Sequence, residues 1–129
     1  MARPNNARYS ASHEWATLED GLLTLGITDH AIEALGDIVF IDLPDAGREL
    51  ERGESTIEIE SVKAVGEVYA PVSGTIEAVN DGLGDDPAPL VSDPFGAGWL
   101  VKIRVSDDAG FGEMIDLDAY ETLLTSAEE

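Results

Sequence analysis

The stretch Glu60-Ser61-Val62-Lys63-Ala64 lies between two segments that have the pattern of β-strands. Before it, Ile57-Glu58-Ile59-Glu60 alternates apolar and charged residues, which indicates a strand with one buried face and one exposed face. After it, Gly66-Glu67-Val68-Tyr69-Ala70-Pro71 resumes an extended pattern and stops at a proline, which cannot donate to an interior sheet ladder. The sequence therefore predicts a β-hairpin with Lys63 at its tip.

A lysine at a hairpin tip is accessible but is not enclosed by a cleft. It is poorly placed to act as a general base or a Schiff-base amine, because both roles need a desolvated amine. An exposed amine on a rigid two-stranded support is instead a good acceptor for covalent acylation, which removes the charge and makes the side chain a long tether. The alternative is that Lys63 is only a solvated charge in a turn. Against that alternative, the seven basic residues include only two lysines, Lys63 and Lys102.

This hairpin, followed by Ala70-Pro71-Val72-Ser73-Gly74, resembles the lipoylation hairpin and the next strand of the glycine cleavage system H protein family. Other blocks resemble the family in the same order, and the resemblance covers about residues 9–125. They are Ser12-His13-Glu14-Trp15, Gly26-Ile27-Thr28-Asp29, Leu35-Gly36-Asp37-Ile38-Val39-Phe40, Leu43-Pro44 and Gly98-Trp99-Leu100-Val101-Lys102-Ile103. The resemblance implies lipoate covalently attached to Lys63, with Glu60, Ser61, Val62 and Ala64 as the supporting hairpin.

The function implied by the resemblance is that of a non-catalytic carrier for the aminomethyl group of glycine. A pyridoxal-phosphate glycine decarboxylase (P protein) would load the oxidised lipoyl arm, and an aminomethyltransferase (T protein) would pass the carbon to tetrahydrofolate. Dihydrolipoyl dehydrogenase (L protein) would reoxidise the dithiol, and a lipoate ligase or lipoyl transferase would attach the cofactor. In such a system the cofactor carries the chemistry and the protein supplies reach and presentation.

The resemblance also implies a cleft that shelters the loaded arm from water. By position, Ser12, Glu14 and Glu67 resemble the lining of that cleft, where a carboxylate would hold the cationic methylamine. The alternative is that these three residues are simply exposed polar residues of strands. Ala34 stands where some relatives carry a polar side chain, so we expect weaker shelter here.

Two related carriers and one unrelated class are the rival interpretations. Biotinyl domains typically place methionines around the lysine, whereas here the neighbours are Val62 and Ala64. Lipoyl domains of 2-oxoacid dehydrogenases typically have aspartate just before the lysine and lack both the His13-Glu14-Trp15 start and a helical C-terminus. An interaction module with an unmodified Lys63 is the third alternative.

Length and composition predict one folded domain. A chain of 129 residues with 43% hydrophobic residues can bury a core but is too short for two ordinary domains. We expect a flexible arm over residues 1–8, a single lipoyl-type carrier domain over 9–125 and a tail over 126–129. The first ten residues lack the apolar stretch of a secretory signal, so we expect a cytoplasmic protein, working as a monomer.

The net charge of −20 limits the possible binding partners and suggests the salt conditions in which the protein works. Such a charge repels nucleic acid and anionic membranes, so we expect neither as a partner. The acids are spread over the chain, which favours adaptation to high salt, and the alternative is an ordinary acidic carrier. The absence of cysteine excludes a disulfide framework, a thiolate metal site and a cysteine nucleophile.

A pass along the chain predicts mainly short strands. Residues 13–18 and 22–27 form a hairpin, a short helix follows with Thr28 or Asp29 as N-cap and Gly36 past its end, and residues 37–43 form another strand. Further strands are predicted over 75–79 and 98–105, and a last helix is capped by Asp116, with Leu117, Tyr120 and Leu124 on one face.

The fold predicted from this pattern is a mainly antiparallel sandwich or flattened barrel. The resemblance implies the same class, mainly β with two antiparallel sheets of the biotinyl/lipoyl type (a barrel-sandwich hybrid), a short helix after the first hairpin and a C-terminal helix.

Other possible chemistry receives little support. The segment 80–94 is rich in Asp, Gly and Pro and is predicted to be an exposed loop, and its acids do not have calcium-loop spacing because Leu83 stands at the third position from Asp81. No metal site is therefore predicted. His13 and His30 are expected to be ordinary hydrogen-bonded histidines, and neither a nucleophile elbow nor a phosphate loop is evident.

Overall fold

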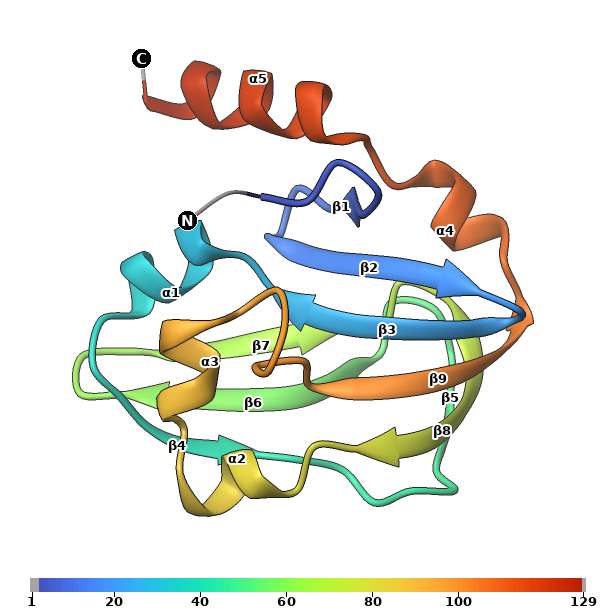
Figure 1. The fold of residues 1–129 in the computed structure, drawn as a ribbon, viewed down its shortest axis with the longest axis horizontal. Helices are drawn as coiled ribbons and strands as arrows, with labels where there is room; N and C mark the ends of the chain where they lie inside the picture. The colour runs from blue at the N-terminus through green and yellow to red at the C-terminus, as the bar shows by residue number, and fades with distance from the viewer. Residues whose placement is uncertain (1–2, 129) are drawn as a thin grey trace.

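The computed structural model describes residues 3–128, and its strands form two antiparallel sheets that pack face to face in a flattened sandwich (Figure 1). The larger sheet has the strand order β1-β2-β3-β9-β8-β5, and the smaller has the order β4-β6-β7. In the larger sheet, the bounds are Arg8–Tyr9 (β1), Glu14–Glu19 (β2), Leu22–Ile27 (β3), Val101–Asp107 (β9), Ser73–Val79 (β8) and Glu49–Leu50 (β5). In the smaller sheet they are Ile38–Asp42 (β4), Ser55–Ser61 (β6) and Val65–Tyr69 (β7). The predicted fold class is confirmed.

The main core lies between the two sheets. Ile57 and Ile59 of β6 are each 1% exposed, while Glu58 and Glu60 between them face solvent. This is the alternation that the sequence predicted for a strand with one wet face. The facing strands contribute buried residues at alternate positions, among them Leu23, Leu25, Ile41, Val68, Ile76 and Ile103.

The first hairpin and the helix after it form where the sequence predicts them. Asp20 and Gly21 take φ values of 53° and 77° in the two-residue turn between β2 and β3, as such hairpins require. Helix α1 spans Asp29–Leu35, and the Thr28 hydroxyl accepts a hydrogen bond from the N–H of Ala31 at 3.3 Å. Gly36 ends the helix with φ 81°.

The segment 80–94 differs from the predicted exposed loop. It contains two short helices, α2 at Gly82–Asp85 and α3 at Ala88–Ser92. Leu83 and Leu90 are 1% and 0% exposed, so the segment contributes to the core. Asp, Gly and Pro are common at the first residues of a helix as well as in loops. Here the burial of Leu83 and Leu90 favours the helical conformation over an exposed loop. A further short helix that was not predicted, α4, spans Ala109–Glu113.

The C-terminal helix α5 spans Leu117–Glu128 and lies across β1, above the larger sheet (Figure 1). Asp116 caps it, with the N–H of Ala119 donating to Oδ1 at 2.9 Å, and Tyr120 and Leu124 are buried as predicted. These two residues form a second apolar cluster with Ala7, Tyr9 and Trp15. Residues 126–128 of the predicted tail continue the helix, and residue 129 lies outside the described residues.

The N-terminal segment is packed rather than loose over residues 3–8. Arg3 Nε donates to Asp29 Oδ1 at 2.8 Å, Ala7 is 3% exposed, and the Tyr9 hydroxyl donates to the carbonyl of Pro4 at 2.6 Å. The segment predicted to be a flexible arm thus makes contacts with the domain over residues 3–8, and residues 1 and 2 lie outside the described part of the chain. Across residues 3–128, no helix has both the length and the apolar character needed to span a membrane.

Candidate functional site

Lys63 lies exposed in the turn of the β6–β7 hairpin. Glu60 pairs with Val65, so the four residues Ser61 to Ala64 form the turn. The N–H of Ser61 donates to the carbonyl of Ala64 at 2.8 Å. The Ser61 hydroxyl also donates to this carbonyl at 3.1 Å and accepts from the N–H of Ala64 at 3.0 Å. Ser61 therefore holds the turn closed, and the lysine extends from an ordered support.

A second contact attaches the tip of the hairpin to the loop after α1. The N–H of Val62 donates to the carbonyl of Asp37 at 2.9 Å. Beside it, the Lys63 side chain runs so close to Gly36 that a Cβ on that glycine would lie 3.2 Å from Lys63 Cε. Val62 and Val65 are 74% and 59% exposed, so the lysine has an apolar residue on either side. An accessible amine on this braced turn can be acylated without any rearrangement of the core.

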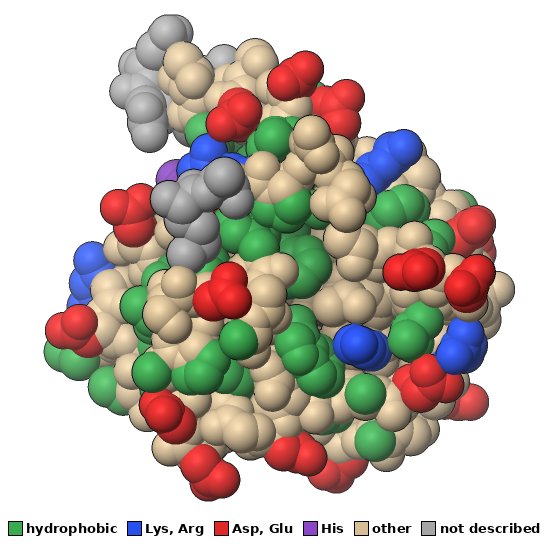
Figure 2. Space-filling model, viewed as in Figure 1, with side chains coloured by type: hydrophobic (Ala, Val, Ile, Leu, Met, Phe, Trp, Pro, Cys, Tyr) green, Lys and Arg blue, Asp and Glu red, His purple; other side chains and the backbone are tan. Residues whose placement is uncertain are grey.

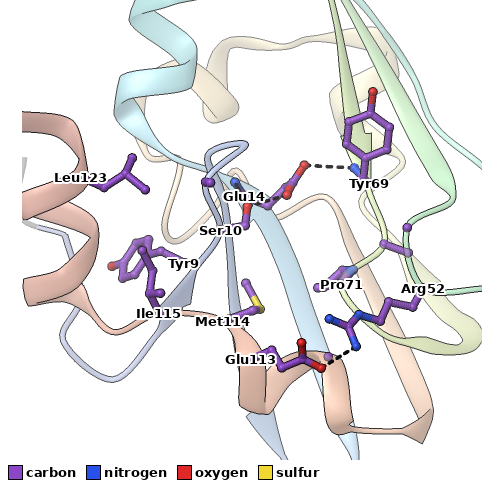
Figure 3. Close-up of a pocket in the computed structure, with 14 residues that line it drawn as sticks. Tyr9, Ser10, Glu14, Arg52, Tyr69, Pro71, Glu113, Met114, Ile115 and Leu123 are labelled. Atoms are coloured by element: carbon purple, nitrogen blue, oxygen red, sulfur yellow. Dashed lines mark hydrogen bonds and ion pairs between the residues drawn. The ribbon is translucent and has the colours of Figure 1, made fainter. Parts of the chain in front are cut away.

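Glu14 is a buried carboxylate at the border between the two sheets. It is 3% exposed, and its Oε1 accepts hydrogen bonds from the Ser10 hydroxyl at 2.5 Å and the Ser12 hydroxyl at 2.6 Å. Its Oε2 accepts from the backbone N–H of Tyr69 at 3.0 Å, as Figure 3 shows. Three donors on one carboxylate satisfy the desolvated charge. Glu14 is therefore not one of the exposed strand residues of the alternative interpretation.

Glu67 joins this group indirectly, through Tyr69. The Tyr69 hydroxyl donates to Glu67 Oε2 at 2.9 Å, and this hydrogen bond raises the pKa of the phenol. Glu67 and Ser12 are both exposed. The structure thus brings Ser12 into direct contact with Glu14, whereas Glu67 is linked to Glu14 only through Tyr69.

Ser10 and Tyr69 were not predicted as members of the site. The alternation Ser10, Ser12, Glu14 was visible in the sequence and could have indicated two hydroxyls near one carboxylate. The part of Tyr69 that contacts Glu14 is its backbone N–H, which has no residue-specific signature in a sequence.

A hollow of about 340 Å³ lies beside Glu14, between β1, the end of β7 and α4. Its walls are largely apolar, and Arg52 and Glu113 form an ion pair of 2.7 Å at one side (Figure 3). The Arg52 guanidinium holds the pKa of Glu113 below its usual value. The hollow therefore combines apolar walls with one buried carboxylate. The labelled lining residues are Tyr9, Ser10, Glu14, Arg52, Tyr69, Pro71, Glu113, Met114, Ile115 and Leu123.

His13 and His30 lie at the junction of α1 and α5. Their rings stack with centroids 4.5 Å apart, and His13 Nδ1 is 2.8 Å from the Tyr120 hydroxyl. That hydroxyl is also 2.8 Å from Thr28 Oγ1. Burial lowers the pKa of His13, and the neighbouring His30 lowers it further. His13 is thus hydrogen-bonded as expected, and its contacts hold α5 against the rest of the domain.

Comparison with known proteins gives a consistent result over nearly the whole chain. Residues 7–127 match the family model described as glycine cleavage H-protein. A protein named glycine cleavage system H protein from Cronobacter sakazakii is 52% identical over 122 residues, which are 94% of this chain and 95% of the relative. A protein of the same name from Thermotoga maritima is 47% identical over 114 residues, which are 88% of this chain and 92% of the relative. The crystal structure of a glycine cleavage system H protein from Mycobacterium marinum superposes with a TM-score of 0.88 at 40% identity, covering 95% of this chain and 99% of that one.

Proposed function

The chain belongs to the glycine cleavage H-protein family, and we propose that it carries the aminomethyl group of glycine on a lipoyl arm attached to Lys63. The observation that supports this most directly is the exposed position of Lys63 on a braced hairpin turn, within the residues that match the family. The bound lipoyl group would supply a dithiolane for group transfer and for reoxidation. The protein would supply an anchored and accessible attachment point.

The residues around Lys63 fit a covalent arm. Ser61 fixes the turn and Asp37 holds Val62, so the base of the arm is held in a defined position. An enzyme that attaches lipoate could recognise the exposed residues on both sides of the lysine, which are Glu60, Val62, Ala64 and Val65. A lipoate ligase or lipoyl transferase is the partner required for attachment.

The other partners in this proposal are glycine decarboxylase, the aminomethyltransferase and dihydrolipoyl dehydrogenase. A tethered arm raises the effective concentration of its reactive end at each of these enzymes. The carrier itself is proposed to be a non-catalytic monomer that works in the cytoplasm.

Ser12, Glu14 and Glu67 are proposed to shelter the loaded end of the arm. The two carboxylates that accept hydrogen bonds from Tyr69 support this role, because they would attract the cationic methylamine group. The test compares the rate at which loaded protein releases ammonia in Glu67→Gln and in Glu49→Gln, a matched exposed glutamate on β5. We expect faster release only in Glu67→Gln, and equal rates in both variants would refute the sheltering role.

The presence of only two lysines allows a direct test of the attachment site. The chain is incubated with lipoate ligase, lipoate and ATP, and its intact mass is measured before and after this reaction. Peptide mapping then locates the modified residue. We expect one lipoyl adduct in wild type and in Lys102→Arg, and none in Lys63→Arg. Lys102 is a suitable control because it lies in β9, with its ammonium over the Trp99 ring at 5.2 Å.

A parallel incubation with biotin ligase, biotin and ATP separates the rival interpretations. A biotin adduct at Lys63 would indicate a biotinyl carrier, and a chain left unmodified by both ligases would indicate an interaction module. If the lipoylated chain cannot be loaded by glycine and the decarboxylase, the glycine cleavage role is excluded, and the chain is still a lipoyl carrier.

A further inference from the structure

A second groove lies beside the turn of the Lys63 hairpin, on the side of α3. It is formed between the loop that follows α1 and the segment that contains α3, and its volume is about 460 Å³. In Figure 1, α3 lies in front of the smaller sheet, toward the end that carries the β6–β7 turn. The lining residues are Gly36, Asp37, Ile38, Asp86, Pro87, Ala88, Val91 and Ser92. None of them belongs to the Ser12, Glu14 and Glu67 group.

The Lys63 side chain already reaches the edge of this groove. A Cβ placed on Gly36 would lie 3.2 Å from Lys63 Cε and 3.7 Å from Nζ, so the end of the lysine runs along a residue that lines the groove. The bond between Val62 and Asp37 keeps the turn in this position. Any group attached to Nζ therefore starts at the edge of the groove.

The chemistry of the walls favours an uncharged apolar occupant. Ile38, Pro87, Ala88 and Val91 supply apolar surface, and Val91 is 49% exposed although it lies on a helix that packs on the core. The Ser92 hydroxyl donates to the carbonyl of Ala88 at 3.0 Å, so it is already satisfied within the helix. Asp37 and Asp86 are exposed and would repel a phosphate or carboxylate ligand. Figure 2 shows the same mixture on this face, with apolar side chains lying among acidic ones.

We propose that this groove is the resting site of the oxidised end of the lipoyl arm on Lys63. The inference depends on the proposed lipoylation of Lys63 and extends it. The uncharged dithiolane ring would cover the apolar walls and remove Val91 from water. Asp37 and Asp86 would also attract the cationic loaded end, but the carboxylates of Glu14 and Glu67 near Tyr69 offer that end a competing site, so the groove is assigned to the uncharged ring. The arm would then have one resting site for each chemical state.

The direct test is the effect of the arm on backbone amide resonances. Uniformly ¹⁵N-labelled protein is compared before and after lipoylation, with the modification verified by mass. We expect shift changes at Gly36, Ile38, Ala88 and Val91 in the oxidised form. These changes should be lost in Val91→Asp, which places a charge in the groove, and kept in Val39→Asp. Val39 is a matched control because it is also an exposed valine, at 57%, and lies outside the groove.

Reduction of the ring by a water-soluble phosphine gives a second readout. If about half of the arms are docked, the ring should be reduced about twofold more slowly than free lipoamide, since only the undocked fraction reacts. Val91→Asp should restore the rate of free lipoamide, and Val39→Asp should not. Unchanged groove resonances together with a rate equal to that of free lipoamide would overturn the proposal.

Failure of the proposed function can be told apart from failure of this inference. If the ligase leaves Lys63 unmodified, the arm is installed chemically in Lys63→Cys, which carries the only thiol because the chain has no cysteine. A haloacetamide derivative of lipoamide then provides the same dithiolane on a tether from position 63. Shifts at the groove amides would support the resting site even though enzymatic lipoylation had failed, and their absence would refute it.

Discussion

Glu14 on β2 accepts a hydrogen bond from the backbone N–H of Tyr69 on β7, with Oε2 3.0 Å from the nitrogen. This bond connects the six-stranded sheet to the three-stranded sheet beside the hollow shown in Figure 3. The Glu14 carboxylate is 3% exposed and has three hydrogen-bond donors, so it stabilises the packing of the two sheets. This structural role is additional to the proposed contact with the loaded arm.

The first prediction follows from this bond. Glu14→Ala would leave the Tyr69 N–H without its acceptor and create a cavity, so we expect a loss of about 2–3 kcal/mol in the free energy of unfolding. Glu14→Gln keeps an amide oxygen for Tyr69, and the two serine hydroxyls can reorient, so it should lose less than half as much. Urea denaturation followed by tryptophan fluorescence measures both. Equal stability of Glu14→Ala and wild type would show that this link is dispensable.

Two glycines of α4 offer a second, matched prediction. A Cβ on Gly110 would overlap the carbonyl oxygen of Pro71, whereas a Cβ on Gly112 would meet nothing within 4 Å. Gly110→Ala should therefore cost about 2 kcal/mol or more, because backbone must move to relieve the overlap. Gly112→Ala should be neutral or stabilise by about 0.5 kcal/mol, since alanine favours a helix. Thermal unfolding of the two variants checks the difference, and the prediction fails if they unfold at the same temperature.

The third prediction concerns the attachment of α5. The Tyr120 hydroxyl is 2.8 Å from both Thr28 Oγ1 and His13 Nδ1, and Tyr120 is fully buried. Tyr120→Phe leaves both partners short of a hydrogen bond and should cost about 1–2 kcal/mol. It should also speed amide hydrogen exchange in α5. Tyr69→Phe is the control, because the Tyr69 hydroxyl is exposed, and its loss should change stability by less than about 0.5 kcal/mol. Unchanged exchange in Tyr120→Phe would contradict the assigned role.

The fourth prediction is a pH dependence of stability. Burial and then the stacked His30 lower the pKa of His13 in the folded state from its ordinary value of 6.5. The unfolded chain therefore binds this proton first, and the contribution of neutral His13 is present above pH 6.5 and is lost as the pH falls below it. The groups around His13 are His30 and Asp29 from α1, Thr28, Tyr120 from α5, Arg3 and Glu14.

His13→Asn provides the comparison for this effect. Asparagine tolerates the φ of 71° at this position and can place a polar atom near the Tyr120 hydroxyl, but it does not titrate. We expect the stability difference between wild type and His13→Asn to shrink or reverse as the pH falls from 7.5 to 5. Using the difference cancels the titration of the many carboxylates. A difference that stays constant with pH would refute the assignment.

The fifth prediction concerns salt. With a net charge of −20, repulsion between carboxylates destabilises the folded state at low ionic strength. The Debye length falls from about 10 Å at 0.1 M to about 3 Å at 1 M, so added salt should raise the unfolding temperature. Sodium chloride and tetramethylammonium chloride should act alike if screening is the cause. No increase between 0.1 and 1 M in either salt would argue against adaptation to high salt.

The hairpins and α1 could be predicted because their signals are local. The alternation of Ile57, Glu58, Ile59 and Glu60 matches the period of a strand. Thr28 and Gly36 have the cap chemistry of a helix start and a helix end within a few residues of one another. The segments that differed depend instead on distant partners. Residues 3–8 are held by contacts such as Arg3 with Asp29, 26 residues away, and α2 and α3 depend on the burial of Leu83 and Leu90.

The same division applies to the candidate site. Sequence patterning by itself determined that Lys63 stands in a turn between two strands, because side chains that alternate every second residue can bury only one face and must place the intervening turn outside the core. Only the tertiary structure decided which groups surround that hairpin. Tyr69 is 55 positions after Glu14 and Lys63 is 27 positions after Gly36, and packing of the two sheets brings each pair together. Contacts of that kind follow from the burial of a shared core, which local sequence cannot specify.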